Sequence, residues 1–231
     1  MATVIWAASA RRTAVWAQPA RASVYVFVHT EAKSSQLESS LEESFNGLEV
    51  TVFGRFRDFE EAMAARPPDA VLGLPPLLAL QKIPIALQGI RAGNDVEQYV
   101  LVGTAASLEG TLADKTIGSV EILGREGTTE LIKTLLKLPD CKLKRVTKLE
   151  DLLPLLQLSL ADAIVLPAAV SKSVSQQSQM SLLVRDIPGG RLGLPAVGIL
   201  NPSARGLVLG QFQKLGAATR TLLRVDRWVE R

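Results

Sequence analysis

The stretch DAVLGLPP at residues 69–76 has a close counterpart later in the chain, DAIVLP at residues 162–167. Each begins with Asp-Ala, continues as an apolar run of strand length and ends in proline, which favours the start of a helix. The shared context indicates that Asp69 and Asp162 are turn or capping residues rather than a catalytic pair. The same strand-to-helix unit therefore occurs twice.

The elements that precede each unit also follow one order. Before the first we expect a strand at 24–29, a helix opened by a Ser35/Glu38 capping box, a strand at 48–53 and a helix at 59–65. Before the second we expect a strand at 116–120, a helix at 128–138, a strand at 142–147 and a helix at 149–158. Strands that alternate with helices imply parallel sheets with right-handed crossovers. The predicted fold class is α/β, with two similar lobes, mainly parallel sheets and two hinge crossings.

The crossings set the expected domain boundaries. Residues 98–107 resemble a strand that leaves the first lobe, and residues 192–200 resemble a return strand. We expect a leader or tail at 1–22, a first lobe at 23–98 plus 200–231, and a second lobe with hinge strands at 99–199. Ligands of such folds bind between the lobes, at the carboxyl ends of the strands.

Composition excludes several functional classes. The net charge of +3 comes from three arginines in the first 22 residues, so 23 bases balance 23 acids from Ser23 onward and no nucleic-acid partner is indicated. The apolar runs are too short and too broken by proline to span a bilayer. One cysteine, Cys141, allows no internal disulfide, and one histidine, His29, argues against multi-histidine metal sites and catalytic triads. We expect no metal and no cofactor. His29 is expected at the end of a strand, with a ligand contact as the lesser alternative.

The two ends of the chain are harder to interpret. The segment ARA before Ser23 has the form of a signal-peptidase site, but the apolar stretch TAVWA is short for an export signal. An atypical leader and a disordered cytoplasmic tail both remain open. At the other end Arg220, Arg224, Arg227 and Arg231 are predicted to share one helical stripe, either a solvated face or a docking surface for an acidic partner or a membrane.

The stretch SVEILGREGTTELIKTLL at residues 119–136 is the most informative for function. It predicts a strand, a glycine-containing loop and a helix, with Thr128 and Thr129 at the helix start. Free N–H groups and hydroxyls at a helix start can receive an oxyanion. The alternative is that this segment is only a well-capped turn.

Three longer stretches resemble type 2 periplasmic solute-binding proteins, closest to the phosphate/phosphonate-binding branch that serves ABC transporters. They are SLEGTLADKTIGSVEILGREGTTELIKTLL (107–136), VTKLEDLLPLLQLSLADAIVLP (146–167) and FRDFEEAMAARPPDAVLGLPP (56–76). The resemblance covers roughly 24–200, and its weight lies in the order and the doubling of weak motifs.

The resemblance implies that ligand oxygens are held by hydroxyls and N–H groups at helix starts. These are Gly127, Thr128 and Thr129 in the second lobe, and Ser34 and Ser35 in the first.

The chain departs from that branch in being short and in carrying carboxylates in the loop. Glu121 and Glu126 lie there with only Arg125 to offset them, which favours a ligand with a cationic part, such as an aminoalkyl phosphonate. The ligand-binding prediction therefore includes Glu121 and Arg125.

The sequence thus predicts a periplasmic receptor of an ABC importer, a binding protein rather than an enzyme. We expect a monomer with a small anionic or zwitterionic ligand, a membrane permease as partner and no catalytic residue. The alternatives are a sensory module on the same fold and an enzyme in which Glu121 acts as a base.

Overall fold

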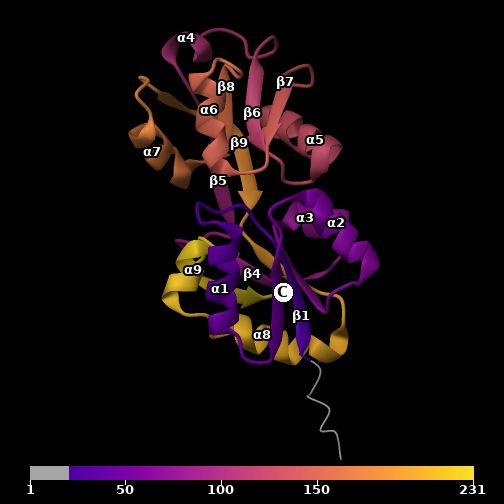
Figure 1. Ribbon diagram of the computed structural model, residues 1–231. Coiled ribbons are helices and arrows are strands. Elements are labelled where there is room, and N and C mark those ends of the chain that lie inside the picture. The colour runs from indigo at the N-terminus through magenta and orange to yellow at the C-terminus, as the bar shows by residue number, and fades with distance from the viewer. Residues whose placement is uncertain (1–20) are drawn as a thin grey trace, which may run out of the picture.

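The computed structural model describes residues 21–231 and has two α/β lobes, one stacked on the other (Figure 1). The first-lobe sheet has the strand order β11-β4-β10-β3-β1-β2, and the second-lobe sheet has the order β7-β6-β8-β5-β9. The first sheet comprises β1 (Ala22–Phe27), β2 (Leu48–Val52), β3 (Ala70–Gly73), β4 (Ile85–Ile90), β10 (Ala196–Ile199) and β11 (Arg227–Glu230). The second comprises β5 (Val96–Gly103), β6 (Thr116–Val120), β7 (Lys142–Val146), β8 (Ala163–Pro167) and β9 (Leu183–Gly193). The predicted two-lobe α/β fold class is confirmed.

The helices cover both sheets. The first lobe contains α1 (Ser34–Ser44), α2 (Phe56–Ala65), α3 (Pro75–Leu80), a 3₁₀ turn at Pro202–Ala204, α8 (Arg205–Gln213) and α9 (Ala217–Leu222). The second contains α4 (Ala105–Leu108), α5 (Gly124–Leu136), a 3₁₀ turn at Leu149–Asp151, α6 (Leu152–Gln157) and α7 (Ala168–Gln177). Among the helices of residues 21–231, none combines the length and the apolar composition needed to cross a membrane.

Alternation along the strands places a core on each face of each sheet. In β1, Val24 and Val26 join the cluster under α1 and α8, whereas Phe27 joins an aromatic cluster with Phe56 and Phe59 of α2. Side chains of a strand point to opposite faces in turn, so a strand buried on both faces is apolar throughout. In β5 the same alternation sends Leu101 to one second-lobe core and its neighbours Val100 and Val102 to the other.

The sheets are mixed rather than mainly parallel, which corrects the sequence-based expectation. Strands β1, β2 and β3 are parallel, as are β6, β7 and β8. The connecting strands run the other way: β10 is antiparallel to β3 and β4, and β5 is antiparallel to β8 and β9. The antiparallel pairs arise because the chain enters the second lobe along β5 and leaves it along β9, so these two connecting strands run in opposite directions.

The crossings lie at residues 91–95 and 194–195, between β4 and β5 and between β9 and β10. The return strand β10 is hydrogen-bonded between β3 and β4 in the first sheet, although the expected second-lobe range 99–199 contains it. Conversely, Val96 and Gln98 pair with β9 in the second sheet. An apolar strand pattern does not indicate which sheet will accept its hydrogen bonds. Of the expected leader, residues 1–20 lie outside the described residues, and Ala22 is already part of β1.

The doubled Asp-Ala unit has one geometry in both lobes. The Asp69 Oδ2 atom accepts a hydrogen bond from the N–H of Ser23 at 2.7 Å, and the Asp162 Oδ2 atom accepts one from the N–H of Thr116, also at 2.7 Å. In each case the carboxylate tethers the start of the neighbouring parallel strand. This agrees with the sequence-based interpretation of both residues as structural.

Two helix assignments differ from the prediction. Helix α5 begins at Gly124, four residues before Thr128, with Leu123 as its N-cap. At the C-terminus, α9 ends at Leu222 and the chain continues as β11, so the four arginines share no helical stripe. Arg224 has a left-handed φ of 57° in the turn that ends the helix. The packing of Trp228 and Val225 in the first-lobe core overrides the helical spacing of the arginines.

Candidate functional site

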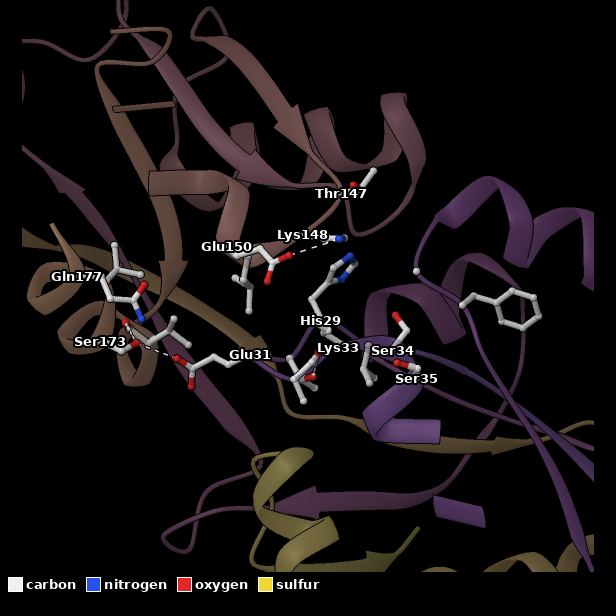
Figure 2. A pocket seen from close by; sticks show the side chains of 18 residues that line it. His29, Glu31, Lys33, Ser34, Ser35, Thr147, Lys148, Glu150, Ser173 and Gln177 are labelled. Atoms are coloured by element: carbon white, nitrogen blue, oxygen red, sulfur yellow. Dashed lines mark hydrogen bonds and ion pairs between the residues drawn. The ribbon is translucent and has the colours of Figure 1, made fainter. Parts of the chain in front are cut away.

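A pocket of about 450 Å³ lies between the lobes (Figure 2). Its volume is in the range of small-molecule sites, and the lobes contribute segments that follow the carboxyl ends of β1, β2, β7 and β8. The first lobe supplies residues 28–35 together with Phe53 and Gly54. The second supplies residues 147–150 and, from α7, Val170, Ser173, Val174 and Gln177.

Ser34 and Ser35 are placed together in this pocket. They begin α1, whose N-cap is Lys33, and both are exposed. The expected capping box between Ser35 and Glu38 does not form, because Glu38 accepts a hydrogen bond from the N–H of Val52 instead. Within residues 21–231 the two serine hydroxyls have no hydrogen-bond partner, and the first N–H groups of a helix have no intrahelical acceptor. This corner of the pocket therefore offers a group of free donors.

Gly54 keeps the corner open. A Cβ atom at this glycine would lie 3.3 Å from the Ser34 hydroxyl oxygen, a tight contact. The small residue after β2 thus leaves space beside the helix start.

Charged side chains of both signs line the pocket. Lys148 and Glu150 form an ion pair at 3.4 Å on the second lobe. Glu31 accepts a hydrogen bond from the Ser173 hydroxyl at 2.7 Å, and this contact joins the two lobes across the pocket. Within the described part of the chain, neither Glu31 nor Lys33 has an ion-pair partner within 4 Å, although both line the same cavity. An unpaired carboxylate and an unpaired ammonium group are thus available to a ligand.

His29 forms part of the wall on the first-lobe side. Burial, together with the nearby positive charge of Arg224, lowers the pKa of His29 to about 4, while the backbone of Thr147 acts in the opposite direction. The ring is therefore neutral at pH 7. It packs edge-to-face on Phe27, with ring centroids 5.0 Å apart. The sequence-based interpretation placed His29 at the end of a strand and kept a ligand contact as the lesser alternative; β1 ends at Phe27, so His29 lies in the loop that follows, and it lines the pocket.

A second cavity of about 20 Å³ lies next to the first and shares His29 and Leu149 with it. Tyr99 and Arg224 line it, and burial raises the pKa of Tyr99 to about 12 although the Arg224 charge opposes the shift. Arg224 donates a hydrogen bond to the backbone oxygen of His29 at 3.3 Å and lies 3.3 Å from Glu97 of β5. Arg224, expected on a surface helix, instead links the first lobe to the hinge strand.

The second-lobe residues of the sequence-based site prediction lie outside the pocket lining; these are Glu121, Arg125, Gly127, Thr128 and Thr129. Because α5 begins at Gly124, both threonines lie beyond its first turn. The buried Thr128 Oγ1 atom accepts hydrogen bonds from the N–H groups of Ile122 and Leu123 at 2.9 and 2.8 Å. The Thr129 hydroxyl donates to the backbone oxygen of Arg125 and accepts from Arg145. Their role as ligand contacts stays a prediction.

Apolar packing occupies the cleft beside this loop. Gly124 has a φ of +69°, and a Cβ atom there would lie 2.7 Å from the Phe56 ring of the first lobe. Leu123 packs on the same aromatic cluster, and a Cβ atom at Gly127 would lie 2.9 Å from the Cβ of Leu123. Glu121 lies near Glu60 of α2, whose pKa is raised by burial and by the Glu121 charge. The loop therefore touches the first lobe without opening into the pocket.

Several lining residues were missed by sequence reasoning, namely Glu31, Lys33, Thr147, Lys148, Glu150, Ser173 and Gln177. For Glu31, Lys33 and residues 147–150 the usable signal was position, since they follow parallel strands. Ser173 and Gln177 lie in the middle and at the end of α7, where no local pattern indicates the pocket. Within residues 21–231 no three His, Cys, Asp or Glu side chains converge as a metal site would require.

No protein-family model matches this sequence, and no curated protein is similar to it in sequence. Solved structures share its fold. The substrate-binding protein of an amino acid ABC transporter superposes with a TM-score of 0.57 at 19% identity, covering 87% of this chain and 97% of its own. The chain has the two-lobe fold of periplasmic binding proteins.

Two further structures agree. The GluR0 ligand-binding core from Nostoc punctiforme in complex with L-glutamate has a TM-score of 0.59 at 12% identity, over 88% of this chain and 95% of that one. The protein Tv2483 bound to L-arginine has a TM-score of 0.62 at 11% identity, over 90% and 93%. At such identities the likeness establishes the fold.

Proposed function

We propose that this protein is the solute receptor of an ABC importer and holds a small zwitterionic ligand in the pocket between its lobes. The observation that carries this proposal is that the pocket contains one negative and one positive side chain without ion-pair partners in the described structure, the carboxylate of Glu31 and the ammonium group of Lys33. A zwitterion would neutralise both, whereas a simple anion or cation would leave one uncompensated.

The anionic end of the ligand would bind at the start of α1. Ser34 and Ser35 contribute hydroxyls and free N–H groups there, and Lys33 adds a positive charge. A hydrogen bond to a charged group contributes roughly 1.5–3 kcal/mol, and the helix terminus adds roughly 0.3–1 kcal/mol. A carboxylate or a phosphonate group fits these donors, in line with the sequence resemblance to phosphonate receptors.

The cationic end would bind toward Glu31. Its carboxylate already accepts a hydrogen bond from Ser173, so the negative charge is held at the junction of the two lobes. His29 is neutral and adds no repulsion toward a ligand ammonium group at pH 7. The amino acid, L-glutamate and L-arginine named for the similar structures are ligands of this type.

The likeness in fold to substrate-binding proteins supports a binding role, with a periplasmic location and a membrane permease as partner. Ligand contacts from both lobes favour the closed arrangement, and a permease can distinguish a closed receptor from an open one. Residues 121–129 would then contribute to lobe contact through Leu123 and Gly124.

The test is a thermal-shift screen followed by calorimetric titration. The panel contains acidic, neutral and basic amino acids, aminoalkyl phosphonates, phosphate, sulfate and simple carboxylates. A zwitterion at ~100 times its dissociation constant should stabilise the protein by about 2.7 kcal/mol, and it should be recovered unchanged.

The residue-level test compares Glu31→Gln with Glu43→Gln, a change at an exposed position of α1 outside the pocket. Glu31→Gln should weaken binding of the zwitterion tenfold or more, by roughly 1.5 kcal/mol, and Glu43→Gln should leave the affinity unchanged. A panel without any stabilising compound, or equal binding of zwitterions and simple anions, would contradict the proposal.

A further inference from the structure

The only histidine of the chain lies where the two lobes meet. His29 follows β1 of the first lobe and lines both the 450 Å³ pocket and the adjoining 20 Å³ cavity, together with Leu149 of the second lobe. The backbone of Thr147, also from the second lobe, is close enough to influence its titration. Separation of the lobes would remove these second-lobe neighbours and expose the ring to water.

We propose that His29 is a proton-operated switch of lobe closure: the neutral ring favours the closed arrangement, and protonation opens it. The pH-dependent opening concerns only the two lobes and their hinge. Its consequence, release of the ligand on acidification, rests on the proposed function.

The charges around His29 favour its neutral form in the closed arrangement. Arg224 approaches from the C-terminal segment, and its guanidinium group donates to the backbone oxygen of His29. The ionisable groups that line the two cavities with His29 are Glu31 and Lys33 from its own loop, Lys148 and Glu150 from the loop after β7, Tyr99 from β5, and Arg224. Of these, Arg224 is the one whose charge shifts the pKa of His29, and it lowers that pKa.

Within the described residues no carboxylate shifts the pKa of His29. Glu150 pairs with Lys148, Glu97 pairs with Arg224 and, at 3.6 Å, with Arg91, and the Glu31 carboxylate, although it has no ion-pair partner, is oriented by Ser173. A protonated His29 would therefore be a partly buried charge beside another positive charge, and opening the lobes relieves that cost by hydration.

Arg224 connects this histidine to the hinge. It bridges the backbone of His29 and the side chain of Glu97, which lies in the first strand after the crossing at residues 91–95. Among the described residues, Arg224 Nη1 and Glu97 Oε1 make ion-pair contacts, to Glu97 Oε2 at 3.3 Å and to Arg91 at 3.6 Å, but neither atom makes a hydrogen bond. An ion pair without hydrogen-bond geometry at these atoms is weakly held, so a positive charge on His29 can displace it and loosen the hinge.

The sign and the size of the effect follow from proton linkage. The pKa of His29 is about 4 in this structure, where the lobes touch through Glu31 and Ser173, against an ordinary value of 6.5 for an exposed ring. This arrangement, the closed form, is thus favoured above pH 6.5 and loses population as the pH falls toward 4. At pH 5 the closed-to-open ratio should be lower than at pH 7.5 by at most about thirtyfold, because Arg224 stays on the lobe of His29 and keeps part of the shift when the lobes separate.

The experiment uses the protein without a histidine tag, so that its single histidine gives one Cε1–H signal in a proton–carbon NMR spectrum. The His29 pKa is read from that signal, and the radius of gyration is measured by X-ray scattering over the same pH range, from 7.5 to 4.5. The same scattering series is recorded for His29→Gln and His29→Asn, which cannot take up the proton. No ligand is needed, so the outcome is independent of the ligand screen.

The expected result is an acid-induced increase in the radius of gyration of the wild type, with a midpoint that coincides with the His29 titration, and no increase in either variant. An expansion that persists in both variants would overturn the proposal. A His29 signal that titrates fully while the radius of gyration stays constant would overturn it as well.

Discussion

Residues 28–33 separate β1 from α1 in the first lobe, whereas only residues 121–123 separate β6 from α5 in the second. Measured from the shared aspartates, Ser34 and Gly127 occupy equivalent positions, since each lies 35 residues before Asp69 or Asp162 (69 − 34 and 162 − 127). Helix α1 begins at this position, but α5 begins three residues before it, at Gly124.

The extra N-terminal residues of α5 change the surface that meets the cleft. In the first lobe the longer loop carries His29, Glu31 and Lys33 into the pocket, and the hydroxyls of Ser34 and Ser35 stay free. In the second lobe Gly124 docks on Phe56 and the Thr128 hydroxyl is used within the loop. The two strand-to-helix units have the same order of elements, but the loop of the first faces the proposed ligand pocket and the loop of the second contacts the other lobe.

The largest expected effect is the loss of unfolding free energy when a buried core side chain of either lobe is truncated. Phe59 and Leu152 lie ten residues before Asp69 and Asp162, and both are fully buried, at 0% exposure. Phe59→Ala should cost roughly 3–5 kcal/mol and Leu152→Ala roughly 2–5 kcal/mol in the free energy of unfolding. Within these ranges Phe59→Ala should be the larger, because the Phe59 ring also packs against Phe27, Phe53 and Phe56.

Urea denaturation of both variants measures this difference, with the slope of the transition checked for a second unfolding step. A larger loss for Leu152→Ala would mean that the aliphatic second-lobe core, not the aromatic cluster, limits stability.

The equivalent hydroxyls of Ser35 and Thr128 should separate stability from binding. Thr128→Val leaves the buried N–H groups of Ile122 and Leu123 without an acceptor, which should cost roughly 1–3 kcal/mol of stability. Ser35→Ala should change stability by less than about 0.5 kcal/mol, because its hydroxyl is exposed and makes no hydrogen bond in the described structure.

Affinity for a ligand identified in the screen should show the reverse order, with Ser35→Ala the weaker binder. If Thr128→Val instead kept its melting temperature and lost affinity, the sequence-based prediction of Thr128 as a ligand contact would be supported and the assignment of the two loops reversed.

The two aspartates should show a smaller and pH-dependent contrast. Burial opposes the charged form of Asp69, but hydrogen bonds from Ser23 and Asn201, with the charge of Arg66, outweigh it and lower the pKa of this carboxyl. Its stabilising effect is therefore present above the ordinary pKa near 3.8 and is lost as the pH falls through the lowered value. Asp69→Asn should lower the melting temperature at pH 7 more than Asp162→Asn, whose carboxylate has the single hydrogen bond to Thr116.

Thermal unfolding at pH 7 and pH 3 tests this point. The deficit of Asp69→Asn relative to the wild type should shrink at pH 3, where the wild-type carboxyl begins to take up its proton. An equal loss of melting temperature at both pH values would show that Asp69 stabilises the fold through its hydrogen-bond geometry and not through its charge.

The sequence by itself determined the features that depend on local pattern. Repetition of Asp-Ala, an apolar run and proline predicted two α/β lobes and the structural roles of Asp69 and Asp162, and the strand at Thr116–Val120 was located correctly. The Ser35/Glu38 pattern located a helix start, and α1 does begin at Ser34, although Lys33 is the N-cap and the capping box does not form; the place of Ser34 in the site came from the family resemblance. These patterns depend on residues within a few positions of one another, so they can be recognised without knowledge of the rest of the chain.

Tertiary structure alone decided which of these local features faces the cleft. Docking of Gly124 on Phe56 accompanies the early start of α5, and pairing with β3 and β4 draws β10 into the first sheet. Arg224 leaves the expected helical stripe because the chain turns to bury Trp228, and it then meets Glu97 and His29. These outcomes depend on contacts between residues far apart in the sequence, whose free energies are set by packing and desolvation in the assembled fold and leave no periodic trace in the sequence.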